Sequence, residues 1–307
     1  MQDKKTLYGL LPAVKEVYEK GENILQFIQH ETGQKGNSAE AIQISYDFQT
    51  GSYVKYIKEN KENVERYTDE LASIINKLAP YNSIMEAGIG EGTTMGLLLP
   101  KLKQKAKQQL GFDISWSRIK LAQAFFRQQQ LESTLFMADL FDIPLADNSV
   151  DIVYTSHSIE PNGGKEDALL KELYRITAKY LVLIEPIYEL GSDEAKKRME
   201  FHGYVKGLKE TAEALGMKVT EYRLLDSLRQ LNNPSGLVLI EKQTNNLAET
   251  VQFICPHSGK KMLKESDCYF CPESSLAYPT ISGIPSLLRS SAILASKYSE
   301  SFDDLLK

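Results

Sequence analysis

Residues 83–94 read Ser-Ile-Met-Glu-Ala-Gly-Ile-Gly-Glu-Gly-Thr-Thr, a short apolar run that leads directly into three glycines at alternate positions. Such a run predicts a buried strand, and glycine permits a sharp turn and the close approach of a ligand because it lacks a side chain. A dinucleotide fingerprint would have its third glycine where this chain has Thr93, one position after Gly92. The spacing therefore makes NAD or FAD the weaker interpretation of this turn.

From residue 83 onward, short apolar runs alternate with amphipathic segments, which is typical of a parallel sheet with crossover helices. The predicted strands span residues 83–87, 109–113, 134–138, 150–155 and 180–185, and the predicted helices span 93–107, 116–130, 165–177 and 193–215. Two further runs, 219–225 and 236–242, predict a terminal hairpin that completes a seven-stranded, mostly parallel sheet. The predicted fold class is therefore α/β, with a doubly wound sheet.

The segments around this sheet predict three units. Apolar residues spaced three and four apart predict helices over residues 1–78, ahead of a sheet domain at 79–243. The polar residues 243–250 are interpreted as a linker into a small module at 251–307. A chain of 307 residues can bury one full core and still carry such an appendage.

Charge and hydropathy limit the partners of the chain. Lys and Arg total 36 against 41 Asp and Glu, a net charge of −5, so no global positive field attracts a nucleic acid, although a local basic patch is not excluded. No long apolar run follows Met1, and nowhere do about 18 apolar residues occur in succession, which predicts neither secretion nor a membrane span. The expected location is the cytoplasm.

Acidic residues stand at the ends of the first three predicted strands. Glu86, just before the glycines, suits a cationic ligand that bears an ammonium group. Asp113, at the end of the second strand, is placed to accept hydrogen bonds from both hydroxyls of a ribose. Asp139 offers a carboxylate to the exocyclic amine of adenine, and Leu140 offers an apolar side chain to its ring. The fourth strand directs Ser156 into the same crevice.

The alternative is that the glycines serve only a tight turn and that both aspartates only cap helices. Four features at strand ends that converge on one crevice favour a shared ligand instead. In this order and spacing they resemble the class I S-adenosylmethionine-dependent methyltransferases over residues 60–242. The resemblance implies an enzyme with S-adenosylmethionine as its cofactor, which has no pyrophosphate and needs no anion cradle. The cofactor-binding residues that follow are Glu86, Gly88, Gly90, Gly92, Asp113, Asp139, Leu140 and Ser156.

Chemistry is expected in the polar loop Ser156–Gly164, after the fourth strand. His157 could deprotonate an acceptor hydroxyl, and Glu160 could orient the acceptor or act as the base. Alternatively, His157 packs against the cofactor, and Glu160 only shapes the loop together with Asn162. Glu185 and His202 are second-tier candidates.

Three classes of function remain open for such a chain. The first is transfer of a methyl group to an oxygen or nitrogen of a small polar or sugar-like metabolite. The second is methylation of tRNA or a protein, and the third is a scaffold that binds the cofactor without turnover. The aromatic segment 46–53 is interpreted either as a lid over the cofactor or as packing against the first core helix.

The three cysteines, Cys255, Cys268 and Cys271, all lie in the C-terminal module. With the ending Tyr278-Pro-Thr-Ile-Ser-Gly-Ile-Pro285, they resemble the small zinc-ribbon-like activator subunits of tRNA and translation-factor methyltransferases over residues 251–290. The resemblance implies zinc held by the cysteines, but Ser258 occupies the place of a fourth ligand, so His257 or a metal-free ribbon are the alternatives. The module is expected to dock on its own catalytic domain, or on that of a second copy in a homodimer.

Overall fold

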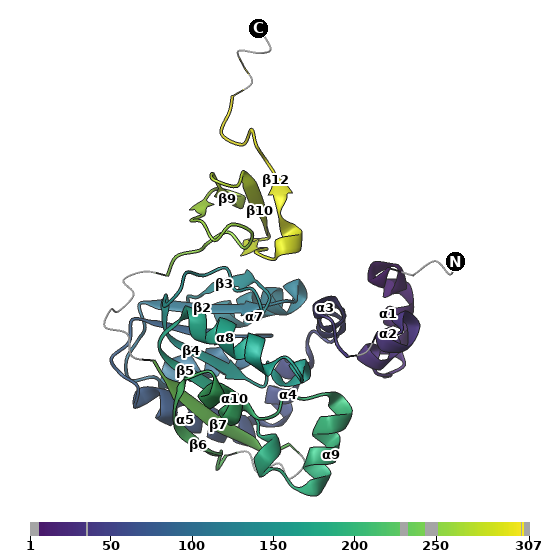
Figure 1. The fold of residues 1–307 in the computed structure, drawn as a ribbon, viewed down its shortest axis with the longest axis vertical. Helices are drawn as coiled ribbons and strands as arrows, with labels where there is room; N and C mark the ends of the chain where they lie inside the picture. The colour runs from purple at the N-terminus through teal and green to yellow at the C-terminus, as the bar shows by residue number, and fades with distance from the viewer. Residues whose placement is uncertain (1–5, 35, 228–232, 243–250, 302, 304–307) are drawn as a thin grey trace.

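The computed structural model describes residues 6–34, 36–227, 233–242, 251–301 and 303. A seven-stranded sheet with the order β3-β2-β1-β4-β5-β7-β6 forms its centre (Figure 1). The strands are β1 (Ser83–Ala87), β2 (Gln108–Asp113), β3 (Thr134–Met137), β4 (Val150–Ser156), β5 (Thr177–Pro186), β6 (Lys218–Leu224) and β7 (Ser235–Glu241). The first five run parallel, and β7 is antiparallel to both β5 and β6. The prediction of an α/β fold with a mostly parallel sheet of seven strands is confirmed.

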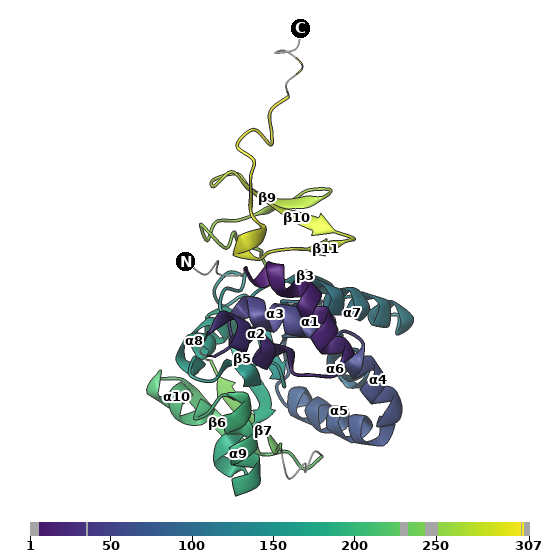
Figure 2. The same ribbon diagram turned by 90° about the vertical axis from the view of Figure 1, so that its right-hand side faces the viewer.

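Helices cover both faces of this sheet (Figures 1 and 2). One face packs against α5 (Lys61–Asn76), α6 (Thr93–Leu98) and α7 (Trp116–Gln128), and the other against α8 (Glu166–Ile176) and α10 (Leu208–Ala214). The apolar residues of α5 recur every three or four positions, so one side of the helix is buried against the sheet while the other is polar. Two apolar clusters result, one on each face.

Two of the predicted helices are wrong in extent. The helix expected at 93–107 ends early, because Pro100 lacks a backbone donor, and the chain passes from α6 into the 3-10 turn η2 (Leu99–Lys101). The helix expected at 193–215 is two helices, α9 (Asp193–His202) and α10. They are separated because Gly203 and Gly207 have left-handed φ angles of 66° and 60°, which interrupt a helix.

The N-terminal part is helical, as predicted. It comprises η1 (Leu7–Leu10), α1 (Leu11–Glu19), α2 (Ile24–Thr32), α3 (Ala39–Phe48) and α4 (Ser52–Glu59). The elements η1, α1, α2 and α3 share a small apolar cluster. Helix α3 also contacts α7, and α4 contacts α5 and α6 of the sheet domain. None of the helices in the described residues is long and apolar enough to cross a membrane.

The C-terminal residues form a second, smaller sheet that lies beyond β3 (Figure 1). Its strands are β8 (Leu263–Lys264), β9 (Cys268–Cys271), β10 (Leu276–Ile281), β11 (Ile284–Pro285) and β12 (Ile293–Leu294). The 3-10 turn η5 (Arg289–Ser291) lies between β11 and β12. The linker expected at 243–250 lies outside the described residues. The boundaries of the three units stay predictions.

The tail docks on the sheet domain of its own chain. The Leu287 amide donates to the Met137 carbonyl at the end of β3 over 3.0 Å, and the Phe253 ring lies 5.0 Å from that of Phe136. Arg289 forms an ion pair of 2.5 Å with Asp142. Tail side chains complete one of the two apolar clusters of the sheet. The expectation that the module docks on its own catalytic domain is confirmed, and it covers an edge strand.

Leu287→Ala tests whether this contact stabilises the whole fold. Leu287 is fully buried in the shared cluster, so its truncation is expected to lower the free energy of unfolding by about 2–4 kcal/mol. Leu294→Ala is the matched control, because Leu294 is 75% exposed in the same tail and its loss is expected to cost less than about 0.5 kcal/mol. Equal effects in urea denaturation would show that the tail is not part of the core.

Candidate functional site

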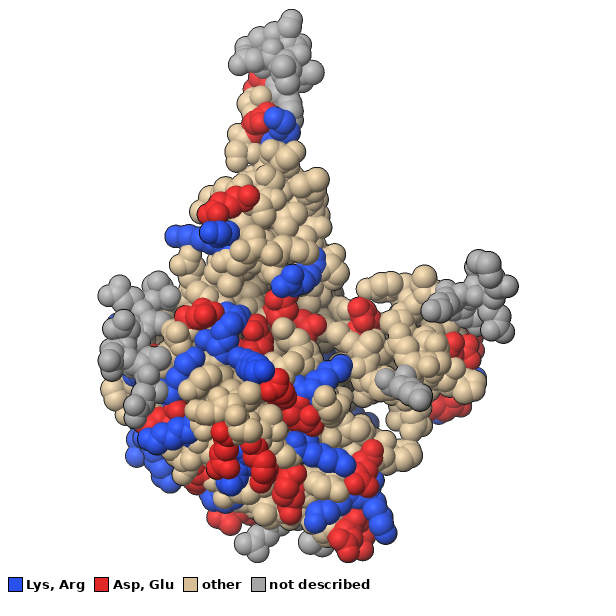
Figure 3. All heavy atoms as spheres, in the orientation of Figure 1, with Lys and Arg blue, Asp and Glu red and all other residues tan. Residues whose placement is uncertain are grey.

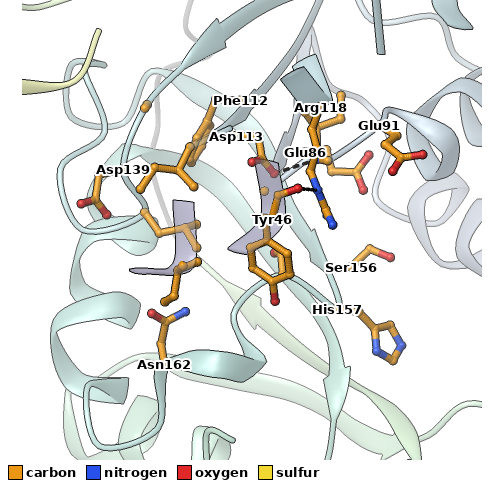
Figure 4. A pocket seen from close by; sticks show the side chains of 18 of the residues that line it. Tyr46, Glu86, Glu91, Phe112, Asp113, Arg118, Asp139, Ser156, His157 and Asn162 are labelled. Carbon is orange, nitrogen blue, oxygen red and sulfur yellow. Dashed lines mark hydrogen bonds between the residues drawn. The ribbon is translucent and has the colours of Figure 1, made fainter. Parts of the chain in front are cut away.

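A cavity of about 920 Å³ opens where the carboxyl ends of the central strands meet (Figure 4). The structure brings together almost all the residues expected to bind a cofactor. The residues of that set that line the cavity are Glu86, Gly88, Gly90, Asp113, Asp139, Leu140 and Ser156, and His157 lines it as well. Gly92 does not line it, and Glu160 lies in a neighbouring cavity.

The glycine turn packs closely against side chains of the protein. Gly88, Gly90 and Gly92 have φ angles of 74°, 54° and 72°, which favour glycine. A β-carbon on Gly88 would collide with Ser158, and one on Gly92 would lie 2.8 Å from the Phe126 ring. Only Gly90 faces the cavity without a collision. Packing against Ser158 and Phe126 is therefore a second reason for glycine at positions 88 and 92, and a role of the three glycines in binding a ligand stays a prediction.

The carboxylates of the cavity are held by short hydrogen bonds (Figure 4). Asp113 accepts from the Gly90 and Ser115 amides, both over 2.9 Å, and burial raises its pKa. Glu86 accepts from the Tyr154 hydroxyl over 2.9 Å, and burial raises its pKa to about 8. A cationic ligand would favour the charged form of both groups.

Neither aspartate serves as a helix cap. Ser115 caps α7, since its hydroxyl accepts from the Arg118 amide, and Asp113 only positions Ser115. Asp139 accepts from the Phe141 amide over 3.0 Å in the loop after β3, and burial raises its pKa. This excludes the capping alternative for both residues.

The aromatic segment joins the cavity through two buried anchors. Glu91, inside the glycine turn, accepts from the amides of Gly51 and Val54 over 2.8 and 2.7 Å at the start of α4. At the end of α3, Asp47 accepts from the Ser115 hydroxyl over 2.8 Å. Tyr46 and Tyr53 line the cavity between these anchors. The segment thus packs against the core and lines the cavity, and its role as a lid over a cofactor stays a prediction.

Arg118, on the first turn of α7, was missed by the sequence analysis. Its guanidinium lies 4.5 Å from the centre of the Tyr46 ring and 5.0 Å from that of Tyr53, and its Nε donates to the Tyr46 carbonyl. It is 4% exposed, and within the described ranges no carboxylate forms an ion pair with it. An arginine early in a predicted helix has no sequence pattern that marks it as buried in a cavity.

A second cavity, of about 1030 Å³, adjoins the first and shares Ser156 and His157 with it. His157 has a left-handed φ of 54°, and its Nε2 lies 2.8 Å from the Ser235 hydroxyl. Its Nδ1 lies 3.6 Å from a Glu160 oxygen. Burial lowers the pKa of His157, but Glu160 and Glu185 outweigh that effect, so the pKa is raised.

Two carboxylate oxygens beside His157 have no hydrogen-bond partner among the residues that the structure describes. They are Oε2 of Glu160 and Oε2 of Glu185, and both atoms are buried. Glu185 was a second-tier candidate, and the structure places it next to His157, where its Oε1 accepts from the Ser158 amide over 3.2 Å. Burial raises the pKa of Glu185 to about 7. His202, the other second-tier residue, lines neither of the two cavities.

Glu185→Gln is expected to stabilise the protein at pH 8 but not at pH 5. The pKa of Glu185 is about 7 in the folded protein, above its value of 4.5 in the unfolded chain. The folded protein therefore becomes less stable as the pH rises from 4.5 to above 7, where Glu185 must ionise while buried. A neutral amide removes this loss, so the gain in unfolding free energy at pH 8 should reach up to about 3 kcal/mol. Urea denaturation at the two pH values measures it, and the wild type at pH 5 is the internal control. An equal effect at both values would contradict the raised pKa.

The cysteines do not gather into a metal site. Cys255 and Cys271 belong to the cluster shared with the main sheet, whereas Cys268 packs in a separate cluster with Phe270 and Ala277. The separation arises because Cys268 and Cys271 lie three residues apart on β9 and so face opposite sides of it. Among the residues that the structure describes, no group of three His, Cys, Asp or Glu could hold a metal ion. The zinc set expected from Cys255, Cys268 and Cys271 is therefore not supported.

The chain is similar to known proteins in the segment that carries the cavity. Residues 84–179 match the family model described as a methyltransferase domain. Comparison with curated proteins found none that matches.

Solved structures that resemble the chain include the magnesium protoporphyrin IX methyltransferase of Synechocystis with bound S-adenosylhomocysteine (14% identity, TM-score 0.46, 76% of this chain and 99% of that one). Another is the complex of the Haloferax volcanii Trm112 methyltransferase activator with a methyltransferase (14%, 0.48, 62% and 93%). A third is the YcgJ protein of Bacillus subtilis (14%, 0.44, 57% and 98%). At these values they carry no argument about the acceptor. The match over residues 84–179 indicates that this part of the chain is a methyltransferase domain.

Proposed function

We propose that the first cavity binds S-adenosylmethionine and that the second binds a small polar acceptor, which receives the methyl group on oxygen or nitrogen. The observation that carries this proposal is that the two cavities meet and share the lining residues Tyr53, Thr93, Thr94, Ser156 and His157. A methyl donor in one and an acceptor in the other would face each other there. Holding both reactants in one geometry is the main contribution of the protein to such a displacement.

The residues of the first cavity fit the parts of this cofactor. Asp113 would accept from the ribose hydroxyls, and Asp139 with Leu140 would bind the adenine. Glu86 would bind the ammonium group. Burial disfavours the charged form of Glu86, and a cation beside it would stabilise that form. When bound, the cofactor supplies an electrophilic methyl group on a sulfonium ion.

Arg118 would bind the carboxylate of the methionine portion. Arg118 is a buried cation that contacts the Tyr46 carbonyl and two aromatic rings. The charge of Asp113 acts on it, but no carboxylate in the described part of the chain lies within ion-pair distance of it. A buried charge is costly without a counterion, so a ligand carboxylate would remove that cost. Figure 4 shows Arg118 beside Asp113.

His157 would accept the proton of an acceptor hydroxyl, and Glu160 would stabilise the resulting imidazolium from 3.6 Å. Polar and aromatic side chains line the second cavity together, which suits a small polar acceptor. On the face shown in Figure 3, Lys and Arg alternate with Asp and Glu over the sheet domain, and no patch of one sign is seen there. This face therefore offers no patch of positive charge to a polyanionic partner.

Calorimetry with S-adenosylmethionine and its decarboxylated analogue tests the cofactor site and the role of Arg118. The wild type should bind S-adenosylmethionine about 30-fold or more tightly than the analogue, because the analogue leaves the Arg118 charge unpaired. Arg118→Gln should bind the two ligands almost equally. If the wild type binds neither S-adenosylmethionine nor S-adenosylhomocysteine, the proposed function is wrong. An unchanged preference in Arg118→Gln would remove only the role of Arg118.

A further inference from the structure

The geometry points to a planar aromatic acid that carries a hydroxyl group as the acceptor, with its carboxylate on Arg198 and its ring among tyrosine side chains. This inference rests on the proposed function, because it names the substrate class of the same site. It concerns the second cavity, which lies between α4, α5 and α9 and meets the first at His157.

Four tyrosines line this cavity from different parts of the chain. Tyr53 and Tyr56 belong to α4, Tyr67 to α5, and Tyr204 to the segment between α9 and α10. Tyr53 and Tyr56 are 40% and 39% exposed, so both rings have apolar surface that a ligand could cover. Aromatic pairs gain about 0.5–1.5 kcal/mol beyond the burial of their area, which favours a planar ring as the occupant.

Arg198 supplies a cation without a counterion to the same cavity. Its Nη1 donates to Asn233 Oδ1 over 3.1 Å and its Nη2 to the Tyr204 hydroxyl over 3.4 Å, and both partners are neutral. In the portion of the chain that the structure describes, no carboxylate lies within ion-pair distance of it. The neutral partners orient the guanidinium without neutralising it. A planar carboxylate matches the free donors of such a fork.

The acidic residue of the cavity does not reverse this conclusion. Glu160 lines the cavity too, but it lies 3.6 Å from His157 and forms no ion pair with Arg198 among the described residues. It therefore does not occupy the free donors of the guanidinium. An acceptor carboxylate could bind those donors.

Transfer of the methyl group to the acceptor oxygen needs no reactant besides the acceptor, S-adenosylmethionine and the base His157. A lone pair of the acceptor hydroxyl forms the new O–CH₃ bond while the sulfonium S–CH₃ bond breaks, and the electron pair of that bond stays on sulfur as a neutral thioether. The hydroxyl proton passes to the His157 imidazole beside Glu160. The acceptor carboxylate stays ionised on Arg198 throughout, so it positions the ring without taking part in bond formation.

Ligand-observed NMR in the presence of S-adenosylhomocysteine tests the inference with the full chain. The probes are 2-, 3- and 4-hydroxybenzoate, the methyl ester of each, and 4-hydroxycyclohexanecarboxylate. At least one hydroxybenzoate should bind about tenfold or more tightly than its neutral ester, and also more tightly than the saturated acid. The same isomer, incubated with S-adenosylmethionine, should give its methyl ether and S-adenosylhomocysteine, both measured by mass spectrometry.

Arg198→Gln is the decisive variant. It should bind the acid and the ester equally while its affinity for S-adenosylhomocysteine stays that of the wild type, and Arg198→Lys should recover part of the preference for the acid. If S-adenosylhomocysteine binds but no hydroxybenzoate does, or if the ester binds as well as the acid, the inference is overturned while the proposed function stands. If S-adenosylhomocysteine itself fails to bind, both are wrong.

Discussion

Asp113→Ala is expected to weaken the binding of S-adenosylmethionine by about 100-fold or more, since hydrogen bonds to a charged group contribute about 1.5–3 kcal/mol each and two would be lost to the ribose. The variant also loses the acceptor for the Gly90 and Ser115 amides, which position the glycine turn and the start of α7. Calorimetry with S-adenosylmethionine and S-adenosylhomocysteine measures the loss.

Two variants separate the charge of Asp113 from general damage. Asp113→Asn keeps one acceptor oxygen and should bind with intermediate affinity. Asp167→Asn, which removes an exposed carboxylate paired with Lys171 on α8, should bind as the wild type does. A thermal melt of each variant without ligand shows whether the fold persists. Binding by Asp113→Ala within threefold of the wild type would exclude the ribose role.

Gly88→Ala is expected to lower the free energy of unfolding by about 2–4 kcal/mol, through a left-handed backbone and a steric collision together. The φ of Gly88 is 74°, and a β-carbon there would overlap Ser158, whose hydroxyl donates to the Ala87 carbonyl over 2.7 Å. Because Ser158 lies next to His157, relief of the collision would also displace the loop that adjoins both cavities. Urea denaturation measures the loss of stability.

A matched glycine isolates the steric part of this effect. Gly164 has a φ of 83°, but a β-carbon there would meet no atom within 4 Å, so Gly164→Ala should cost only the backbone term of about 1–2 kcal/mol. The double variant Gly88→Ala with Ser158→Gly should recover part of the loss, after correction for Ser158→Gly alone. A Gly88→Ala that costs no more than Gly164→Ala would argue against packing as the reason for this glycine.

The order of strands and the carboxylates at their ends could be predicted because both are local features. The run 83–87 is too short for a helix and mostly apolar, and it leads directly into glycines, so the strand follows from its length and composition. Asp113 and Asp139 then had to meet, because parallel strands place their carboxyl ends at one edge of the sheet. The ends of the helices could not be predicted in the same way. Glycine is tolerated within some helices, whereas Gly203 and Gly207 interrupt the helix expected at 193–215.

The partners of buried charges could not be predicted, because they come from distant parts of the chain. Glu91 binds the start of α4 and Arg118 lies against Tyr46, although each pair is separated by dozens of residues. The cysteines show the converse case, because two residues close in sequence can lie far apart in space. Cys268 and Cys271 face opposite sides of β9.

By itself, the sequence determined the α/β fold, the glycine turn and the carboxylates Glu86, Asp113 and Asp139, because local periodicity and strand ends specify them. Only the tertiary structure decided that two of the glycines pack against protein, that Arg118 and Arg198 are cations without acidic partners in the described residues, and that Glu185 lies beside His157. The physical reason is that burial and charge pairing depend on contacts between segments, and residue type alone does not specify those contacts.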